Sequence, residues 1–523
     1  MEIVKFKDLV TSLQLEESLQ NSVLKRLEYS VNLLVTTIER IPIPILIGLI
    51  LSAVYLSFIP DENEEQYMLL AKQFMNPNWI KNSDGIEFPG VRLLYQFIIG
   101  TLLSYVNFES VLFSMRLLMI VSLSIVLSKL YERFQLDNTQ IFTHLALLFI
   151  GHQSLFAGSW MFVSVEAKGF AWILILLSIY YILSKRLYLS LILMIAGSYF
   201  HFLEGFYSFC FIAVTIYFNK NKLGYSNKEL IIMSVMYITA ILPMVLYLTP
   251  ATQQSASNLS PSTNWIYSYF RHPHHAALYP DFTYFLHKHL FGILLTFIGL
   301  IFSIVAFINE KIFEIKFSKS FVISSSAITI LLVSVSFLDR DGGILKFYLY
   351  RINTLTTFIL TMLIMVWIWR LIKEEYKPQT KAILIMLSTV SLFNLSLTNA
   401  HTYKKYFFSK DEVADICSYI KSNTAENDEI ISFIDDLSVS RKAERELFSV
   451  YKFVPAEMNK IHNWYFRVME QRKAKADLNY LDILAVKYGV NHVLIDKDEK
   501  LPSTFEIKYQ NSKYAFYKRM TSN

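Results

Sequence analysis

The sequence predicts a mainly α-helical protein that crosses a membrane several times and carries a small α/β domain at its C-terminal end. Of the 523 residues, 54% are hydrophobic, 15% are aromatic and only 18% are charged, and the mean hydropathy is +0.37. Apolar runs recur between residues 41 and 399, whereas residues 401–523 have mixed charge. The apolar runs lack the alternation of period two that an outer-membrane barrel needs, so helices are expected.

We interpret each apolar run as one transmembrane helix of a bundle, which makes about eleven spans. The runs cover residues 41–59, 110–130, 139–151, 169–184, 187–203, 205–218, 229–248, 286–308, 320–337, 352–370 and 381–399. Basic residues cluster after every second run, as expected for short loops on the cytoplasmic side. The clusters are Lys129 and Arg133; Lys185 and Arg186; Lys220, Lys222 and Lys228; Lys311, Lys316 and Lys319; and Arg370, Lys373, Lys377 and Lys381. This predicts a multi-pass protein of the cytoplasmic (inner) cell membrane, with its N-terminus in the cytoplasm and its C-terminal domain outside.

Two further segments flank the spans. Residues 1–40 have apolar positions at roughly helical spacing with basic residues between them, which favours an amphipathic segment at the membrane interface. In residues 401–523, helical periodicity around 410–422 and 455–487 alternates with strand-like runs at 429–434, 493–496 and 514–518. This alternation predicts a small soluble α/β domain.

The composition argues against several classes of function. The net charge of +6 reflects the basic loops, so it does not indicate nucleic-acid binding. The two cysteines, Cys210 and Cys417, provide neither metal-ligand spacing nor a disulfide framework. The predicted cytoplasmic loops contain no Gly-rich phosphate loop and no nucleotide signature. No cofactor is expected with certainty, and a divalent metal is kept as an alternative for the histidine cluster described below.

Acidic residues follow the first span directly, in the run Pro60-Asp61-Glu62-Asn63-Glu64-Glu65. A carboxylate at the membrane surface beside apolar helices can have its pKa tuned for proton abstraction. Asp61 and Glu62 are therefore the candidate catalytic bases, and because neighbouring positions on a helix point in different directions, only one of them can face a cavity. Substitution at Glu64 is expected to be mild. The alternative is that these acids only solvate the end of a helix.

Two charged pairs lie at the predicted outer ends of spans. Glu166 and Lys168 occur at the start of one span, where ionised groups are costly unless they are paired. His201 and Glu204 lie three residues apart, on one face of a helix at an outer turn. All four are candidate substrate-binding residues. The alternatives are an acid favoured by the helix dipole and a structural hydrogen bond.

The longest outer loop after the first contains the densest group of cations and hydrogen-bond donors, Arg271-His272-Pro273-His274-His275. Arginine offers a planar fork to phosphate oxygens, and imidazoles donate hydrogen bonds near neutral pH, so Arg271, His272, His274 and His275 are predicted to bind a phosphate leaving group. A metal site with an acidic partner and a packed turn are the alternatives.

Two more arginines complete the set of candidate substrate-binding residues. Arg340 belongs to the run Asp339-Arg340-Asp341-Gly342-Gly343, which is also typical of a polar turn. Arg351 stands at a predicted helix start, from which it can reach a lipid phosphate.

The layout resembles the glycosyltransferase-C (GT-C) superfamily, whose members include protein mannosyltransferases and lipid A aminoarabinose transferases. The resemblance rests on Asp61-Glu62 behind the first span, a Tyr-containing helix after it, and the run Phe88-Pro89-Gly90-Val91-Arg92-Leu93-Leu94-Tyr95. Family members usually have a Lys-Pro-Pro or His-Pro-Pro type sequence where this chain has Glu87-Phe88-Pro89. The Glu-x-Lys-Gly, Tyr-Phe-His-x-Leu-x-Gly and Arg-His-Pro-His-His runs also resemble an uncharacterised bacterial branch of such proteins. The resemblance covers most of the chain and implies a GT-C-like helical core with substrate cavities at the outer surface.

The resemblance further implies an inverting glycosyltransferase that moves a sugar from a polyprenyl-phosphate donor to a hydroxyl of a lipid, glycan or protein acceptor. Asp61 matches the position of the family's base, and Glu62 is the second choice. A lipid or glycan transporter or flippase is the main alternative, although its charges should lie in the middle of spans. A non-catalytic protein that binds a glycolipid is a third interpretation.

Overall fold

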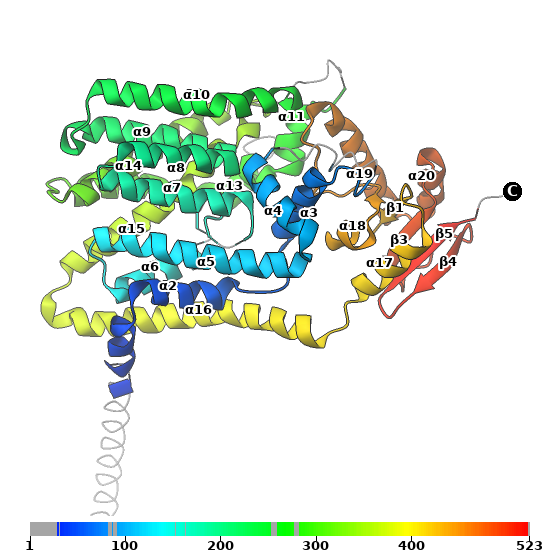
Figure 1. Ribbon diagram of the computed structural model, residues 1–523, viewed down its shortest axis with the longest axis horizontal. Coiled ribbons are helices and arrows are strands. Elements are labelled where there is room, and N and C mark those ends of the chain that lie inside the picture. The colour runs from blue at the N-terminus through cyan, green and yellow to red at the C-terminus, as the bar shows by residue number, and fades with distance from the viewer. Residues whose placement is uncertain are drawn as a thin grey trace, which may run out of the picture.

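The computed structural model describes residues 29–30, 32–81, 86, 91–151, 153–162, 164–252, 259–276 and 282–520. Most of the predicted amphipathic N-terminal segment, and residues 87–90 of the first outer loop, lie outside this set. The described chain forms a helical part that runs to Phe408 and a C-terminal domain built around a five-stranded sheet (Figure 1). The predicted class, a mainly helical protein with a small C-terminal sheet domain, is confirmed.

Every apolar run that the sequence analysis interprets as a span contains a helix. These helices are α2 (Ile43–Tyr55), α5 (Phe108–Arg133), α6 (Asn138–Ile150), α7 (Ala167–Leu183), α8 (Leu187–Phe200), α9 (Phe202–Leu223), α10 (Asn227–Thr252), α13 (Phe282–Ala306), α14 (Phe313–Ser336), α15 (Asn353–Leu371) and α16 (Lys377–Phe408). Between α2 and α5, α3 (Glu62–Met75) and α4 (Leu93–Tyr105) pack against each other. Shorter helical turns are α11 (Thr263–Trp265), η1 (Ile266–Arg271), α12 (Pro273–Ala276), η2 (Leu345–Phe347), η3 (Leu349–Ile352) and η4 (Glu374–Tyr376).

Within the described residues, 7 helical segments are long and apolar enough to cross a membrane. They are Phe108–Arg133, Phe202–Leu223, Asn227–Thr249, Thr283–Ala306, Phe313–Ser336, Leu345–Leu371 and Glu374–Phe408. An eighth is obtained if the helix Asn32–Arg40 and α2, which meet at a bend of 110°, form one span. By length and composition the structure therefore supports about seven spans, fewer than the eleven expected from the sequence.

The difference between the two numbers comes from four short helices. α2, α6, α7 and α8 have 13, 13, 17 and 14 residues. At 1.5 Å per residue they reach about 20–26 Å, against about 30 Å for the hydrocarbon core of a bilayer. Each of the four has one end beside residues that line the cavity described below, such as Phe58, Gly151, Glu166 and His201. The cavity is therefore a recess in the helical part, and the helices around it are short because they end there.

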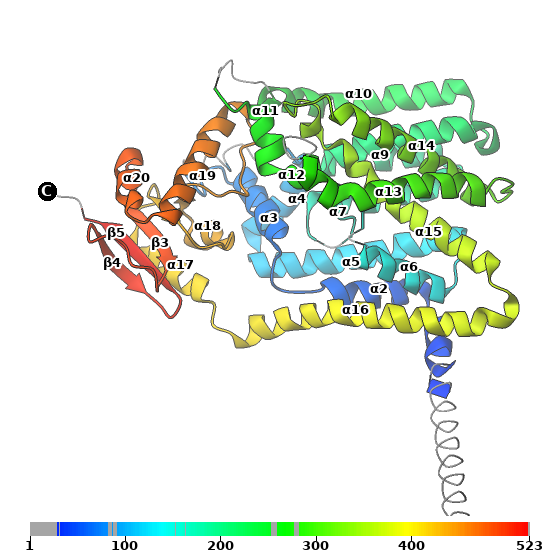
Figure 2. The same cartoon turned by 180° about the vertical axis from the view of Figure 1, so that it is seen from behind.

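The chain passes back and forth between the two ends of the helical part. One end of the helical part carries the basic clusters named above (Figures 1 and 2). The connections at this end are α5–α6, α7–α8, α9–α10, α13–α14 and α15–α16. At the other end lie α3, α4, α11, α12 and the C-terminal domain. The acidic run, the histidine cluster and the C-terminal domain consequently share one end of the molecule. The orientation of this end relative to the cell remains a prediction.

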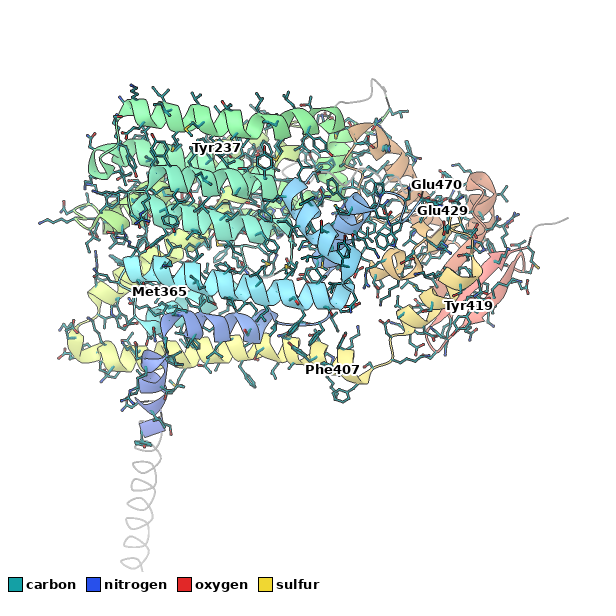
Figure 3. The ribbon with its side chains drawn as sticks, viewed as in Figure 1. Tyr237, Met365, Phe407, Tyr419, Glu429 and Glu470 are labelled. Carbon is teal, nitrogen blue, oxygen red and sulfur yellow. The ribbon has the colours of Figure 1, made fainter. Side chains whose placement is uncertain are left out.

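Buried aromatic side chains hold the helical part together (Figure 3). Tyr237 of α10 is fully buried, stacks on Phe209 of α9 with ring centroids 3.6 Å apart, and shares a hydrogen bond of 2.7 Å with Ser198 of α8. The hydroxyl is satisfied by a polar partner, so the ring can be buried without an unpaired polar group. Trp172 of α7 is also fully buried.

The C-terminal domain has the strand order β2-β1-β3-β5-β4. β1 (Glu429–Ser432) runs parallel to β2 (Glu446–Leu447) and to β3 (His492–Asp496), whereas β5 (Tyr514–Arg519) is antiparallel to β3 and to β4 (Phe505–Gln510). Helix α17 (Glu412–Asn423) precedes β1. The strands are connected by α18 (Ser438–Ala443) between β1 and β2, and by η5 (Met458–Lys460), α19 (Ile461–Ala476) and α20 (Tyr480–Tyr488) between β2 and β3. Each run predicted as helix or strand in this domain is found as such, but β2, β4 and α18 were not predicted. Because α16 continues to Phe408, the domain itself begins a few residues after position 400.

The C-terminal domain is attached to the helical part through α3. Arg441 forms a fork with the buried carboxylate of Glu65, with Nε 2.6 Å from Oε1 and Nη2 3.2 Å from Oε2. The same guanidinium stacks on the ring of Phe108, at 3.9 Å from the ring centroid. Lys452 adds an ion pair of 2.9 Å with Glu62, and Lys81 one of 2.7 Å with Glu426. Helix α3 is thus the main surface on which the C-terminal domain rests.

Candidate functional site

One large cavity, with a volume of about 2220 Å³, lies between the helical part and the C-terminal domain. Its walls on the helical side come from α3, α12, the loop before α7, the start of α9 and η3. The loop after β1 and residues 449–456 supply the opposite wall. Of the twelve candidate site residues, all except Glu204 and Arg340 line this cavity, although they come from segments nearly 300 residues apart in the chain.

Asp61 lies on one wall of the cavity and is the N-cap of α3. Its Oδ1 accepts hydrogen bonds from the backbone N–H groups of Asn63 at 2.7 Å and Glu64 at 2.8 Å, and the Glu64 side chain accepts from the backbone N–H of Asp61 in return. This is a capping box, which explains why the helix begins here. Among the described residues, no hydrogen bond to Asp61 Oδ2 is found, so this oxygen is available to a ligand.

The surroundings of Asp61 raise the pKa of its carboxyl from 3.8 to about 7. The side chain is open to the cavity but has protein on most sides, and this desolvation is the largest cause; the carboxylates of Glu64 and Glu166 also raise the pKa. Arg116 acts in the opposite direction. A base that gains and loses its proton near neutral pH is well suited to general base catalysis.

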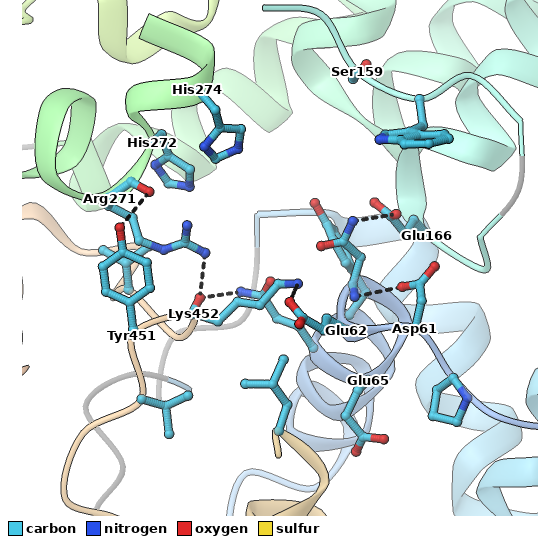
Figure 4. Close-up of a pocket in the computed structure, with 18 of the residues that line it drawn as sticks. Asp61, Glu62, Glu65, Ser159, Glu166, Arg271, His272, His274, Tyr451 and Lys452 are labelled. Atoms are coloured by element: carbon cyan, nitrogen blue, oxygen red, sulfur yellow. Dashed lines mark hydrogen bonds and ion pairs between the residues drawn. The ribbon is translucent and has the colours of Figure 1, made fainter. Parts of the chain in front are cut away.

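The other acids of the first outer run have different surroundings. Glu62 points to Lys452 of the C-terminal domain, as Figure 4 shows, and its side chain is 80% exposed. Glu64 is fully buried: Arg116 Nε lies 2.8 Å from its Oε1, a second guanidinium nitrogen pairs with its Oε2, and the backbone N–H of Val165 donates to it at 2.8 Å. Contrary to the sequence-based expectation, substitution of Glu64 should be severe, because it would leave Arg116 buried without its partner.

Glu166 and Lys168 form an ion pair of 3.1 Å on the cavity wall. Glu166 is buried and also accepts hydrogen bonds from Asn63 Nδ2 at 3.1 Å and from the Ser164 hydroxyl. It therefore connects the entrance of α7 to the first turn of α3, as the close-up in Figure 4 shows. The opposite charges of Glu166 and Lys168 compensate each other, which allows both side chains to lie at the start of an apolar helix.

His201 and Arg351 line another wall of the cavity, and the buried Glu204 pairs with Arg351. His201 is the N-cap of α9, and Arg351 Nη1 lies 3.0 Å from His201 Nε2 and 3.3 Å from Glu204 Oε1. Glu204 also accepts a hydrogen bond of 2.8 Å from the hydroxyl of Ser159. The pair predicted on one helix face is thus completed by an arginine that lies about 150 residues further along the chain.

Arg271 lies at the end of η1 and contacts the C-terminal domain. Its Nη2 donates to the carbonyl oxygen of Lys452 at 3.2 Å, and its guanidinium lies 5.0 Å from the centroid of the Tyr451 ring (Figure 4). The carbonyl of Lys452 also accepts from Gln66 Nε2 of α3 at 2.9 Å. The segment around Lys452 therefore bridges α3 and η1 across the cavity.

The three histidines after Arg271 are grouped, with ring centroids 4.1 Å apart for His274 and His275 and 6.1 Å for His272 and His274. Burial, followed by the charge of Arg271, lowers the pKa of His272 well below its usual value. Burial and Lys288 lower the pKa of His274 to about 4, and burial and His274 lower that of His275. All three rings are consequently neutral at neutral pH, so the positive charge of this loop comes from Arg271.

The hydrogen bonds of the histidines limit what they can bind. His275 Nδ1 lies 3.3 Å from the carbonyl oxygen of Ala157. A carbonyl oxygen can only accept, so Nδ1 carries the proton and Nε2 is an acceptor. The Nδ1 of His272 is already engaged by the hydroxyl of Tyr348 at 2.8 Å. An acceptor such as His275 Nε2 suits a hydroxyl group better than a phosphate oxygen.

Three arginines point to an anionic ligand. Arg92, Arg271 and Arg351 all line the cavity, and the Nε of each is buried without a hydrogen-bond partner among the described residues. A buried donor without a partner is costly, the more so on a charged group. Three such groups around one cavity are the arrangement expected when the ligand that pairs with them is a phosphate or another anion.

Arg92 and Tyr67 also line the cavity, although neither was among the candidate site residues predicted from the sequence. Arg92 Nη2 donates to the hydroxyl of Tyr67 at 3.0 Å, and its guanidinium lies 4.1 Å from the centroid of that ring. The signal that would have found Arg92 is its position, since it is the only arginine in the outer segment 60–107 of the sequence.

Arg340 does not line the cavity, and its side chain is exposed. The neighbouring Asp339 accepts backbone hydrogen bonds from Gly343 at 2.9 Å, Ile344 at 2.8 Å and Leu345 at 2.8 Å. This segment is therefore a hydrogen-bonded turn before η2, in line with the alternative interpretation of the run.

The described residues were also considered as ligands for a metal ion. No group of three or more His, Cys, Asp or Glu side chains in the described part of the chain lies close enough to hold a metal ion.

On the helical side, the cavity is lined by apolar side chains, Leu147 and Ile150 of α6 and Phe291 and Leu295 of α13. α15 lies between α6 and α13 (Figure 2). Leu147, Ile150 and Phe291 are exposed, so the cavity reaches the apolar outer surface of the helical part.

Comparison with protein-family models and with curated proteins found no match for this chain. What the fold and the cavity define is the class alone: a mainly helical protein with about seven helices suited to a membrane and a polar, arginine-lined cavity beneath a C-terminal domain.

Proposed function

We propose that this protein is an inverting, membrane-bound glycosyltransferase that moves a sugar from a polyprenyl-phosphate donor to an acceptor hydroxyl at the outer face of the membrane. The observation that carries the proposal is that one cavity is lined both by Asp61, a carboxyl with a pKa of about 7, and by three arginines with unpaired buried Nε groups. A lipid phosphate donor needs an anion site next to an apolar entrance, and the exposed apolar residues of α6 and α13 supply such an entrance.

In the proposed reaction Asp61 Oδ2 takes the proton of the acceptor hydroxyl as its oxygen forms a bond to the anomeric carbon of the sugar. The bond between that carbon and the phosphate oxygen breaks, and its electron pair stays on the departing polyprenyl phosphate. Arg92, Arg271 and Arg351 neutralise the charge that develops on this phosphate. Asp61 Oδ1 caps α3 and accepts hydrogen bonds from two backbone N–H groups, which holds the carboxylate in place. Its Oδ2 is left for the substrate.

The proposed orientation follows from the distribution of charge. The basic clusters lie at the end of the helical part opposite the C-terminal domain, and by the positive-inside rule this supports a cytoplasmic location for that end. Asp61, the arginines and the C-terminal domain then face the outside. The site would thus act on a donor that has already crossed the membrane.

Binding of polyprenyl phosphate by the purified protein in nanodiscs tests the proposal. We expect polyprenyl phosphate to bind at least tenfold more tightly than the corresponding polyprenol, because the alcohol cannot pair with the arginines. Arg351→Gln and Arg92→Gln should each weaken phosphate binding by about 10- to 100-fold, the usual range for a hydrogen bond to a charged group. Arg340→Gln, which removes an exposed arginine outside the cavity, is the matched control and should bind as the wild type does. Equal binding of phosphate and alcohol would contradict the proposal.

A further inference from the structure

The carboxyl ends of β1 and β3 open into the same cavity as Asp61. These two strands are neighbours and run parallel. The chain leaves β1 toward β2 on one side and leaves β3 toward β4 and β5 on the other, so the connections depart in opposite directions. In open sheets of this kind a crevice forms outside the carboxyl ends at such a point, and ligands bind there. Ser432 at the end of β1 and Tyr514 opposite the end of β3 both line the cavity.

Two buried serine hydroxyls in this crevice lack partners. Ser432 is 6% exposed and Ser438 is 7% exposed, and no hydrogen bond to either Oγ is found within the described residues. Both residues line the cavity. A buried hydroxyl normally finds a partner, so this pair indicates a ligand that supplies hydrogen bonds at this position.

The neighbouring side chains hold the crevice in shape. Gln471 Nε2 donates to the carbonyl oxygen of Ser432 at 2.7 Å, and Gln471 Oε1 accepts from the hydroxyl of Ser449 at 2.8 Å. Asp436 accepts from the backbone N–H of Ser438 at 2.8 Å. The polar atoms of the crevice are therefore fixed before a ligand arrives, which lowers the entropy lost on binding.

Charges of both signs surround the two serines. The carboxylates of Asp435 and Asp436 line this side of the cavity together with the cations of Arg441, Lys442, Arg472, Lys475 and Lys513. A site with hydroxyls, carboxylates and cationic donors suits a ligand with many hydroxyl groups, because each hydroxyl of the ligand can serve as donor or acceptor.

We infer that this crevice binds the acceptor and that the acceptor is a glycan. The inference rests on the proposed function, since it assigns the second substrate of that reaction. The donor phosphate occupies the arginines on the helical side, and the acceptor sugar hydrogen-bonds to Ser432, Ser438 and Asp435 on the domain side. Its reacting hydroxyl faces Asp61 across the shared cavity. The C-terminal domain is then the part of the protein that selects the acceptor.

Two binding measurements on the full-length protein in nanodiscs test the inference. The first uses fluorescently labelled oligosaccharides released from the surface polysaccharides of the producing cell, with anisotropy as the readout. The second uses polyprenyl phosphate, as above. We expect Ser432→Ala/Ser438→Ala to weaken oligosaccharide binding by about 4- to 100-fold, since each lost hydrogen bond is worth about two- to tenfold. Polyprenyl-phosphate binding and the melting temperature should not fall, because the removed hydroxyls have no hydrogen-bond partner among the residues that the structure describes.

Ser418→Ala/Ser422→Ala, which changes two exposed serines of α17 outside the cavity, is the matched control and should bind both probes normally. Oligosaccharide binding that survives in Ser432→Ala/Ser438→Ala, or the absence of any oligosaccharide binding by the wild type, would overturn the glycan site. If the wild type binds the oligosaccharide but does not bind polyprenyl phosphate, the proposed donor would be refuted and the glycan site in the crevice would be retained.

Discussion

Replacement of Asp61 with Asn separates the two roles that the structure gives this residue. Asn is about as good an N-cap as Asp, so the hydrogen bonds to the backbone N–H groups of Asn63 and Glu64 should be kept and α3 should begin where it does now. What Asn cannot do is take a proton from the acceptor. General base catalysis typically contributes about 100- to 10,000-fold, equivalent to about 3–5 kcal/mol of barrier, and turnover should fall by that factor.

The same substitution makes a prediction about stability. The pKa of Asp61 is raised from 3.8 to about 7 in the folded protein, so its ionised form is disfavoured by folding. This penalty is absent below pH 4 or so, grows between about pH 4 and pH 7, and is complete above. Asp61→Asn should therefore raise the melting temperature relative to the wild type at pH 8 and leave it unchanged at pH 4. Asp61→Ala loses the cap as well, which costs about 1 kcal/mol of helix stability.

The assay for turnover is the release of polyprenyl phosphate from a polyprenyl-phosphate-linked sugar in membranes that contain the protein. The wild-type rate should rise as pH increases through about 7, as the Asp61 carboxylate forms. Glu166→Gln removes a carboxylate that raises this pKa, so the rise should move to lower pH. Glu62→Gln is the matched control, because Glu62 carries the same charge one position away and points to Lys452. Loss of turnover in Glu62→Gln with normal turnover in Asp61→Asn would refute the assignment of the base.

Three other predictions concern the domain, the topology and the donor. Arg441→Ala leaves the buried carboxylate of Glu65 without its partner, which should cost about 3–5 kcal/mol of docking energy and make the α16–α17 linker more sensitive to limited proteolysis; an unchanged digestion pattern would count against this contact as the anchor of the domain. Reporter fusions should place Asn219 in the cytoplasm and Asn463 outside, and the same compartment for both would invalidate the proposed orientation. Arg271→Lys keeps the charge but loses the fork, so polyprenyl-phosphate binding should weaken several-fold; unaltered binding would remove Arg271 from the donor site.

The helical part was predictable from the sequence because each span carries its own signal. A run of about twenty apolar residues indicates a membrane helix without any reference to the rest of the chain. Several runs are already short in the sequence, but the sequence did not indicate the reason: α6 and α8 end beside the cavity, where Ser154 and His201 line it. The strand β4 was missed because most of it is exposed at a sheet edge, and β2 because it has 2 residues.

The candidate site was predictable in part. Asp61, Glu166 and Arg351 stand out as charges at the ends of apolar runs, and they do line one cavity. Their partners could not be read from one sequence, because the contacts join distant segments: Arg351 meets His201 across 150 positions, and Arg441 meets Glu65 across 376. The mild effect expected for Glu64 is replaced by the prediction of a severe one for the same reason, since nothing near Glu64 in the sequence indicates that it is buried against Arg116.

The central claim is that the cavity transfers a sugar from a polyprenyl phosphate, and mass spectrometry of lipid extracts tests it most directly. Extracts would be compared from wild-type cells, from cells that lack the protein, and from cells that carry only Asp61→Asn. We predict that one polyprenyl-phosphate-linked sugar accumulates in both altered strains and not in the wild type, because its consumption requires the base. The absence of any accumulating lipid-linked sugar, or accumulation without the protein but not with Asp61→Asn, would contradict the account.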